Sequence, residues 1–219
     1  MKEKEYMRLE SDSIGTMEVP EDAYYGVQAL RAKENFPITG TKLHPVFIKN
    51  LAKIKRAAAI TNRKAGRLKP EIANAIEASA NEVICGMFDK DFIVDGIQGG
   101  AGTSANMNMN EVIANRAIEM LCGKKGDYTI VHPNDHVNMA QSTNDVIPTA
   151  GKLTVLDLLK PLDKSLSLLT DALYDKAAAF DHIVKIGRTQ LEDAVPMRLG
   201  QTFHSYATMI SRDRDRLTK

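Results

Sequence analysis

The chain has 219 residues, of which 43% are hydrophobic, so it is long and apolar enough for a sizeable core in one or two domains. Its 29 basic and 28 acidic residues give a net charge of +1, which argues against a binding surface for nucleic acid or for an anionic membrane. Aromatic residues make up only 5% and Trp is absent, so the composition favours helices over sheets.

The cysteines and the N-terminus bear on the compartment. Cys85 and Cys122 are the only cysteines and lack the spacing of metal ligands, so we expect two free thiols in a reducing environment. No apolar run follows the charged residues 1–6, so no signal peptide is expected. No stretch approaches the ~20 apolar residues of a membrane-spanning helix. These features predict a cytoplasmic protein.

The N-terminal third is expected to begin irregularly and then become helical. Turns are predicted at residues 19–22 and 36–40, with one short helix between them over residues 23–35. Two longer helices follow, from His44 to about Gly66 and from Pro70 to Cys85. Each opens beside a proline, and Gly66 suits the end of the first one.

A glycine-rich segment, residues 99–104, follows a β-prone stretch at 92–98 that predicts a strand or an extended link. Thr103 and Ser104 are candidate N-caps for a helix that runs to about Leu121. Glycines at a helix start leave N–H groups free to attract a carboxylate or a phosphate. The alternative is a cap that serves only its own backbone. The segment is neither a Walker A loop nor a Rossmann fingerprint.

Four asparagines crowd this helix, at positions 106, 108, 110 and 115. Asparagine is a poor helix former, and a buried asparagine needs hydrogen-bond partners. Either a polar network or a ligand would supply them.

Residues 134–145 are almost devoid of apolar side chains, although they lie just before a core helix. They close a predicted loop that begins near Lys124. A solvated loop with Asn144 or Asp145 as the N-cap is the structural alternative to a binding role. His132 and His136 are four residues apart but lack a third ligand, so a zinc site is disfavoured, and a general acid/base role for His136 is a weak alternative.

From about Pro148 the pattern becomes that of long helices. Large apolar residues recur in steps of three and four, which is typical of a coiled-coil-like stripe on a helix kinked at Pro161 and stopped by Gly187. The stripe consists of Leu159, Leu162, Leu166, Leu169, Leu173 and Phe180. Pro196 precedes a further helix.

The polar segment 187–193 lies between these two helices. Arg188 is expected to pair with Glu192 or Asp193 rather than to bind a ligand. Thr189 and Gln190 are the better candidates for ligand contact.

Together these segments resemble the aspartase/fumarase superfamily, and most closely its aspartases. At 99–104 and 141–145 fumarases usually differ from the pattern found here. The resemblance is carried by Pro-Glu-Asp-Ala-Tyr-Tyr-Gly at 20–26, Gly-Gly-Ala-Gly-Thr-Ser with Asn-Met-Asn at 99–110, Asn-Asp-His-Val-Asn and Gln-Ser-Thr-Asn-Asp at 134–145, and Gly-Arg-Thr-Gln-Leu-Glu-Asp-Ala-Val-Pro at 187–196.

The resemblance implies a mainly α, L-aspartase-like fold. An N-terminal helical domain would occupy residues 1–145, and residues 146–219 would form the first part of a long central helix bundle. It further implies a homotetramer built through that bundle, with sites that draw on three chains. The implied reaction is the anti elimination of ammonia from L-aspartate to give fumarate, without a cofactor and without a metal.

The resemblance also assigns substrate contacts position by position. Thr103, Ser142 and Thr143 would hold the C4 carboxylate, where charge develops after a base removes a proton from C3. Asn144 and Gln190, with Thr143, would contact the amino group, and Thr189 would help to hold the other carboxylate. Many members carry His where this chain has Gln190, so no proton shuttle is expected at that position.

The base of the family is a serine in a Gly-Ser-Ser-x-Met-Pro-x-Lys-x-Asn signature, and no such string occurs in these 219 residues. Family members are also about twice as long. We therefore expect this chain to be an N-terminal portion that is inactive by itself.

Two alternatives remain. The first is a class II fumarase, which hydrates fumarate to malate, although Ser104, Thr143 and Gln190 argue against it. The second is a non-catalytic helical module that binds a partner through the apolar stripe, in which case the polar segments would be superfluous.

Overall fold

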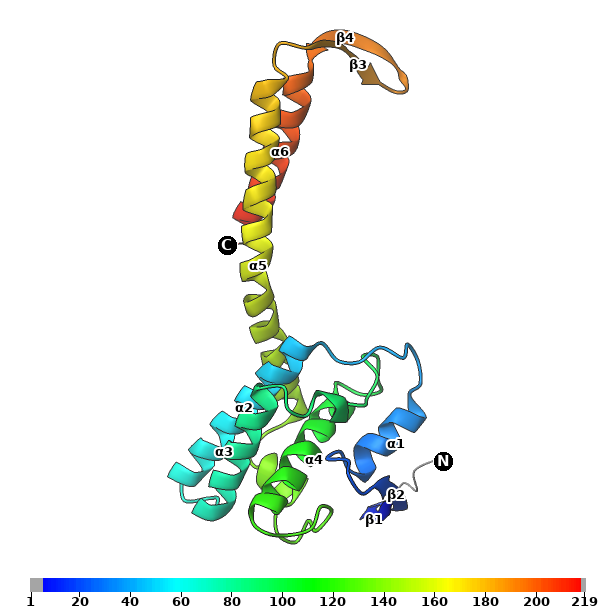
Figure 1. The fold of residues 1–219 in the computed structure, drawn as a ribbon, viewed down its shortest axis with the longest axis vertical. Coiled ribbons are helices and arrows are strands. Elements are labelled where there is room, and N and C mark those ends of the chain that lie inside the picture. Colours follow the sequence, from blue (N-terminus) through cyan, green and yellow to red (C-terminus); the bar gives the residue numbers. More distant parts are fainter. Residues whose placement is uncertain (1–5, 218–219) are drawn as a thin grey trace. The chain divides into compact units, whose positions relative to one another are not determined.

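The computed structural model describes residues 6–217. It divides into two compact units, Met1–Thr154 and Val155–Lys219, and each is described by itself. Helices dominate both units (Figure 1). This confirms the mainly α fold that the composition and the resemblance predicted. Among the described residues, no helix combines the length and the apolar character needed to cross a membrane.

The first unit begins with an antiparallel hairpin of β1 (Met7–Asp12) and β2 (Gly15–Pro20). The prediction of an irregular N-terminus was therefore wrong. The inward residues of β1 include Arg8 and Glu10, which form an ion pair of 2.7 Å beneath the hairpin. Charged residues at the buried positions hide the alternation of apolar and polar residues that identifies a strand in sequence.

Helix α1 (Val27–Asn35) begins four residues later than predicted. Its first N–H groups are held by two buried carboxylates instead of by a side chain of the helix itself. Glu111 accepts from the backbone of Gly26, Gln28 and Ala29 at 2.8–3.0 Å, and Glu10 accepts from Val27 at 2.9 Å.

Helices α2 (Pro45–Lys64) and α3 (Pro70–Ile84) confirm the two predicted long helices. Each has its proline at the first helical position, where no N–H is needed. Residue His44 caps α2, because its Nδ1 accepts the N–H of Val46 at 3.2 Å. Gly66 follows the helix with φ of +67°, as a helix-ending glycine does.

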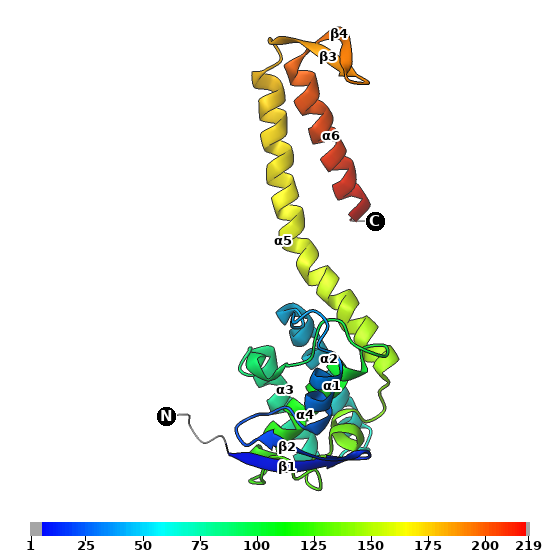
Figure 2. The ribbon, with the colours of Figure 1, turned by 90° about the vertical axis from the view of Figure 1, so that its right-hand side faces the viewer.

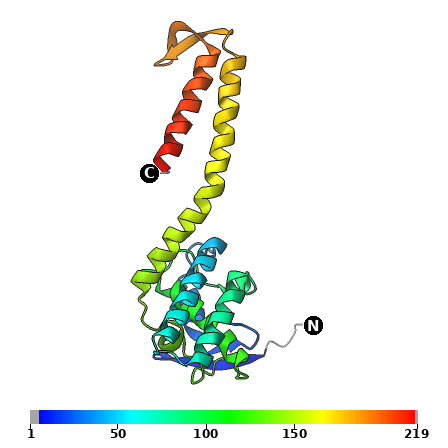
Figure 3. The same ribbon diagram turned by 90° about the vertical axis from the view of Figure 1, so that its left-hand side faces the viewer.

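After the short turn η1 (Asp89–Asp91), residues 92–98 form an extended link rather than a strand. Its only ladder contact among the described residues is an isolated bridge between Asp95 and Lys42. Helix α4 (Thr103–Met120) follows and is buried along nearly its whole length. Figures 2 and 3 show α2, α3 and α4 side by side, and their apolar faces form the main core of this unit.

Two further elements connect α4 to the second unit. The loop predicted over residues 124–138 contains a helical turn, η2 (Pro133–Val137), which His132 caps. Helix α5 (Thr143–Ala179) starts earlier than the predicted Pro148 and runs through Pro161 without ending. Its first turns complete the core of the first unit through Val146 and Ala150.

The second unit consists of the rest of α5, a hairpin of β3 (Val184–Thr189) and β4 (Glu192–Arg198), and α6 (Leu199–Leu217). The prediction that Gly187 stops the long helix was wrong, since α5 ends at Ala179 and Gly187 lies within β3. A Cβ at Gly187 would come within 2.8 Å of the Val195 carbonyl oxygen, so the strand pairing requires a glycine there.

The apolar stripe predicted on α5 is partly covered by α6. The tilted rings of Phe180 and Phe203 pack with centroids 5.4 Å apart, and Asp163 pairs with Arg214 at 2.8 Å. Leu162 and Leu169 in the stripe nevertheless remain 47% exposed. The second unit therefore presents much apolar surface to its surroundings.

Candidate active site

Three of the six predicted site residues lie at the N-terminal end of α5, namely Ser142, Thr143 and Asn144. Ser142 precedes the helix, and its Oγ accepts the backbone N–H of Asn144 at 3.3 Å. The Asp145 carboxylate in turn accepts the N–H of Ser142 at 3.2 Å. These two hydrogen bonds cap the first turn of the helix, so Ser142 is the N-cap and not Asn144 or Asp145.

The hydroxyl of Thr143 also accepts a hydrogen bond from the protein, since the Asn106 amide Nδ2 donates to its Oγ1 at 3.3 Å. A hydroxyl has one hydrogen to donate and two acceptor positions. Ser142 and Thr143 each use an acceptor position within the protein and keep a hydrogen to donate. Two neighbouring hydroxyls of this kind at the positive end of a helix suit a carboxylate ligand.

Thr103 lies at the start of α4, close in sequence to Asn106. It is exposed and is not an N-cap, contrary to the prediction, because Gly102 takes that place with φ of +89°. Ser104 is not a cap either and is buried within the first turn. A Cβ at Gly102 would lie 2.8 Å from the Cγ2 of Ile147, so a glycine lets the starts of α4 and α5 approach closely.

Thr189 and Gln190 belong to the second unit, at the tip of the β3–β4 hairpin. Gln190 and Leu191 form the turn with φ of +49° and +66°, values that non-glycine residues rarely adopt. Arg188 pairs with Asp193 at 2.8 Å across the hairpin, which confirms the structural role predicted for it. The strained, exposed turn presents the polar side chains predicted to bind a ligand.

The structure thus gathers four of the predicted residues around the starts of α4 and α5, namely Thr103, Ser142, Thr143 and Asn144. The other two, Thr189 and Gln190, share one turn of the second unit.

The four asparagines of α4 are all buried. Two of them serve the fold, because Asn108 bonds the backbone of Asp91 and Ile93, and Asn115 bonds the backbone of Tyr24 and Gly126. Asn106 differs, since it faces the candidate site. A polar network within the protein therefore supplies hydrogen-bond partners to Asn106, Asn108 and Asn115, while a ligand contact at Asn106 stays a prediction.

Two residues beside the site were not identified from sequence, the buried Lys55 on α2 and the half-buried Asn138 after η2. The Lys55 ammonium, fully buried, donates to the Asn138 Oδ1 at 2.7 Å, and burial lowers the pKa of Lys55 to about 7. A signal was present, because Lys55 occupies the same helical face as the core residues Leu51, Ala52 and Ala59.

The histidines near η2 accept hydrogen bonds from the local backbone. His132 uses Nδ1 to accept the N–H groups of Asn134 and Asp135, and His136 uses Nδ1 to accept the N–H of His132 at 2.9 Å. Burial lowers the pKa of His136. Within residues 6–217, no cluster of three or more His, Cys, Asp or Glu side chains suits a metal ion. Cys85 and Cys122 are both free thiols, as predicted, and both are exposed.

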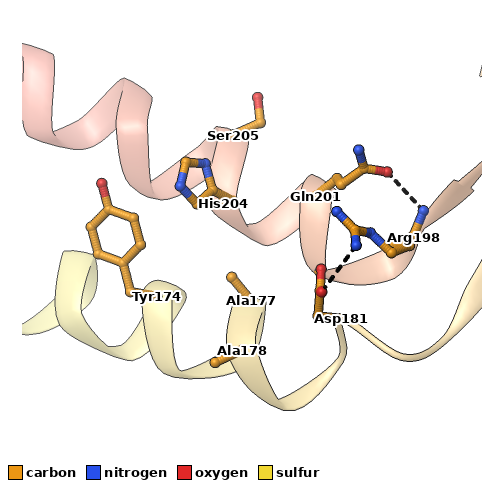
Figure 4. A pocket seen from close by; sticks show the side chains of 9 residues that line it. Tyr174, Ala177, Ala178, Asp181, Arg198, Gln201, His204 and Ser205 are labelled. Atoms are coloured by element: carbon orange, nitrogen blue, oxygen red, sulfur yellow. Dashed lines mark hydrogen bonds and ion pairs between the residues drawn. The ribbon is translucent and has the colours of Figure 1, made fainter.

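One cavity flanks the candidate site and another lies in the second unit. One of about 610 Å³ flanks the glycine-rich segment between Lys42 and Thr154. Another of about 710 Å³ lies between α5 and α6 in the second unit, where Tyr174 packs against His204 and Asp181 pairs with Arg198 at 3.3 Å (Figure 4). Neither is lined by any of the six predicted site residues.

Comparison with known proteins adds independent evidence. A family model described as Lyase matches residues 15–219. An aspartate ammonia-lyase of a Bacillus species is 51% identical over 211 residues, and one of Helicobacter pylori J99 is 52% identical over 209. A class II fumarate hydratase of Halobacterium salinarum is 53% identical over 211 residues. The matches cover 94–96% of this chain but 45% of each relative, so the chain spans about half their length.

Solved structures resemble the fold closely. A structure titled fumarate lyase:delta crystallin from Brucella melitensis superposes with a TM-score of 0.90 at 47% identity, covering 96% of this chain and 50% of that one. A class II fumarase from Schistosoma mansoni superposes with a TM-score of 0.85 at 38% identity, covering 96% and 44%.

Proposed function

This chain belongs to the lyase family, and on that basis we propose that it supplies the N-terminal half of an aspartate ammonia-lyase. The reaction is the reversible anti elimination of ammonia from L-aspartate to give fumarate. The observation that carries the proposal is the pair of hydroxyls on Ser142 and Thr143, each accepting a hydrogen bond from the protein and each with a hydrogen left to donate.

These hydroxyls suit the most demanding step of the elimination. When a base removes the proton from C3, negative charge moves onto the C4 carboxylate, and fixed donors stabilise that charge as it develops. Ser142 and Thr143 act in this role, with Thr103 from the start of α4 as a third donor. No metal or other cofactor is required, because the hydroxyls and the helix dipole supply the positive potential.

The leaving amino group and the second carboxylate need other partners. We assign the amino group to Asn144 and Gln190, with the remaining acceptor position of Thr143 as a third contact. Thr189 helps to hold the other carboxylate. The base is the serine of the Gly-Ser-Ser-x-Met-Pro-x-Lys-x-Asn signature, and this sequence does not contain that signature. The chain is therefore inactive by itself.

A class II fumarase is the second candidate, favoured by the relative from Halobacterium salinarum at 53% identity. The aspartase reading is preferred for two reasons. Two of the three relatives reported above carry the aspartate ammonia-lyase name. In addition, the sequence at Ser104 and Thr143 follows the aspartase pattern.

We further propose that the complete enzyme is a cytoplasmic homotetramer assembled through its long helices. The exposed apolar residues of α5 and α6, such as Leu168 and Met209 at 63% and 56% exposure, support burial in an assembly. The two exposed thiols, Cys85 and Cys122, fit a reducing compartment. The domain division at residues 145 and 146 stays a prediction.

The test is reconstitution. The chain is co-expressed with the part of the Bacillus species aspartate ammonia-lyase that lies beyond its matched region, and this reconstituted assembly is purified. Fumarate formation from L-aspartate is followed by ultraviolet absorbance, with malate as the alternative substrate. Turnover of aspartate by the assembly and not by the chain alone supports the proposal. If the assembly converts malate and not aspartate, the fumarase assignment is established instead. If this chain converts aspartate without the added part, the claim that it lacks the base is refuted.

A further inference from the structure

Beside the candidate site lies a chain of buried and half-buried polar side chains that joins three elements of the first unit. Lys55 of α2 donates to Asn138 Oδ1 at 2.7 Å. Asn106 of α4 donates from Nδ2 to the same oxygen at 3.2 Å and to Thr143 Oγ1 at 3.3 Å. The exposed fractions of Lys55 and Asn106 are 0% and 2%.

The direction of every hydrogen bond in this chain is fixed from its buried end. Lys55 donates to Asn138, and the Asn138 Nδ2 donates to the Gln141 carbonyl oxygen at 3.3 Å, so the Asn138 atom that faces Lys55 is the oxygen. The Asn106 atom that faces the same oxygen must then be the amide nitrogen. Because that nitrogen also faces Thr143, the hydroxyl oxygen of Thr143 has to accept.

The other side of Asn106 supports this reading. Its Oδ1 is buried and has no hydrogen-bond partner among residues 6–217. Turning the amide over would not help, because the oxygen would then face the Asn138 oxygen. A buried carbonyl oxygen without a hydrogen-bond partner is unfavourable and rare in folded proteins. Since Asn106 keeps this amide orientation nevertheless, a neighbouring group must impose it. Here the constraint is Lys55 acting through Asn138.

We propose that Asn106, oriented by Lys55 through Asn138, is a positioning residue that keeps the Thr143 hydroxyl turned to donate its hydrogen to the substrate carboxylate. The inference rests on the proposed function, since it assigns a direction to a hydroxyl of that site. Without the Asn106 donor, the Thr143 hydrogen can rotate toward the protein, and the carboxylate loses a fixed donor.

A double-mutant cycle in the reconstituted assembly tests this directly. Asn106→Leu removes the donor, Thr143→Val removes the hydroxyl, and the fourth protein carries both changes. We expect Asn106→Leu to lower kcat for aspartate about tenfold with a smaller effect on KM, because a fixed donor matters most as charge develops. In the Thr143→Val background the same change is expected to alter kcat less than twofold, since the hydroxyl that it orients is gone.

The matched control is Asn108→Leu, an equally buried asparagine of the same helix that bonds only backbone atoms. Its effect is expected to be the same with and without the Thr143 hydroxyl, because it acts only on the fold. Asn106→Ser, whose side chain is too short to reach Thr143, replaces Asn106→Leu in the cycle if that variant does not fold. In an active assembly, the substitutions at Asn106 and Thr143 could instead lower kcat by independent factors, so that the double variant shows the product of the two. That result would overturn the positioning role and leave the proposed function standing.

Calorimetric titration with fumarate measures the ligand affinity of the same four proteins and does not require turnover. If the assembly converts neither substrate, coupling between Asn106 and Thr143 in fumarate affinity would still support the positioning role while the proposed reaction fails. Absence of coupling in affinity would overturn the positioning role, and absence of fumarate binding to the parent assembly would overturn both.

Discussion

Ser142 and Asp145 cap the start of α5 reciprocally, with the Asp145 carboxylate accepting the Ser142 N–H at 3.2 Å while the Ser142 hydroxyl accepts the N–H one residue before Asp145 at 3.3 Å. A residue predicted to bind substrate therefore also holds the helix end in place. The two roles are compatible, because capping uses the oxygen of the hydroxyl and ligand binding uses its hydrogen.

The cap predicts a stability effect for Asp145. We expect Asp145→Ala to lower the free energy of unfolding by about 1 kcal/mol, as loss of a capping side chain generally does. Urea unfolding followed by circular dichroism measures the change. Asp145→Glu keeps a carboxylate that reaches back to the same N–H, and it is expected to stay near the parent. Equal losses in the two variants would contradict the capping role.

Thr143 is predicted to be a catalytic residue, and its neighbour Thr149 supplies the control. Thr143→Val keeps the shape and removes the hydroxyl, so kcat/KM for aspartate in the reconstituted assembly is expected to fall about 100-fold. The Thr149 hydroxyl donates to the Asp145 carbonyl within its own helix at 2.6 Å. Thr149→Val should therefore leave kcat/KM within about twofold of the parent. A similar loss in both variants would mean that the effect comes from the helix and not from the site.

The buried carboxylate of Glu111 is predicted to hold α1 in place. It accepts three backbone N–H groups with both oxygens, and Gln can offer only one oxygen. Glu111→Gln is expected to lower the free energy of unfolding by at least about 2 kcal/mol, because it sets an amide N–H against backbone donors. The same substitution at the exposed Glu34 of α1 should change it by less than about 0.5 kcal/mol. Thermal unfolding of the two variants measures these changes, and equal losses of stability would contradict the role of Glu111.

Burial of Lys55 predicts a pH dependence of stability. Its pKa falls from 10.5 to about 7 in the fold, so between these values the unfolded chain binds a proton that the folded chain has released. The free energy of unfolding due to this group therefore rises with pH from 7 to 10.5, and the penalty for burying the charge is complete below pH 7.

Lys55→Met removes this titration. The stability of the variant relative to the parent is expected to be most favourable at or below pH 7 and to decline steadily toward pH 10.5. Urea unfolding at a series of pH values measures the difference, with the exposed Lys64→Met of the same helix as the control. A difference for Lys55→Met that stays constant with pH would show that Lys55 keeps an ordinary pKa.

The turn at the tip of the β3–β4 hairpin is predicted to be strained. Leu191 has φ of +66° and is 99% exposed, so its side chain gains no packing within this chain. Leu191→Gly is expected to raise the melting temperature, since the strain relieved is roughly 1 kcal/mol. Leu9→Gly, at a strand position that is 72% exposed, should lower it. Destabilisation by both substitutions would show that the turn is relaxed.

The sequence determined those parts of the protein whose causes are local. Helices α2 and α3 were predicted nearly to the residue, because Pro45, Pro70 and Gly66 set their ends through their own backbone preferences. The polar segments were identified for the same reason. Hydroxyls and amides gathered at helix ends stand out against an apolar background, and the structure brings the starts of α4 and α5 together.

Only the tertiary structure decided the rest, because the partners lie far away in the chain. A charged residue, Arg8, can occupy a buried position of strand β1 because it donates hydrogen bonds to the carbonyl oxygens of Pro20, Ala23 and Tyr25 beyond the turn. Lys55 is tolerated in a core position because Asn138, 83 residues later, accepts its hydrogen bond. Whether a charged residue in a buried position finds hydrogen-bond partners depends on residues far away in the chain, and a local sequence pattern does not contain them.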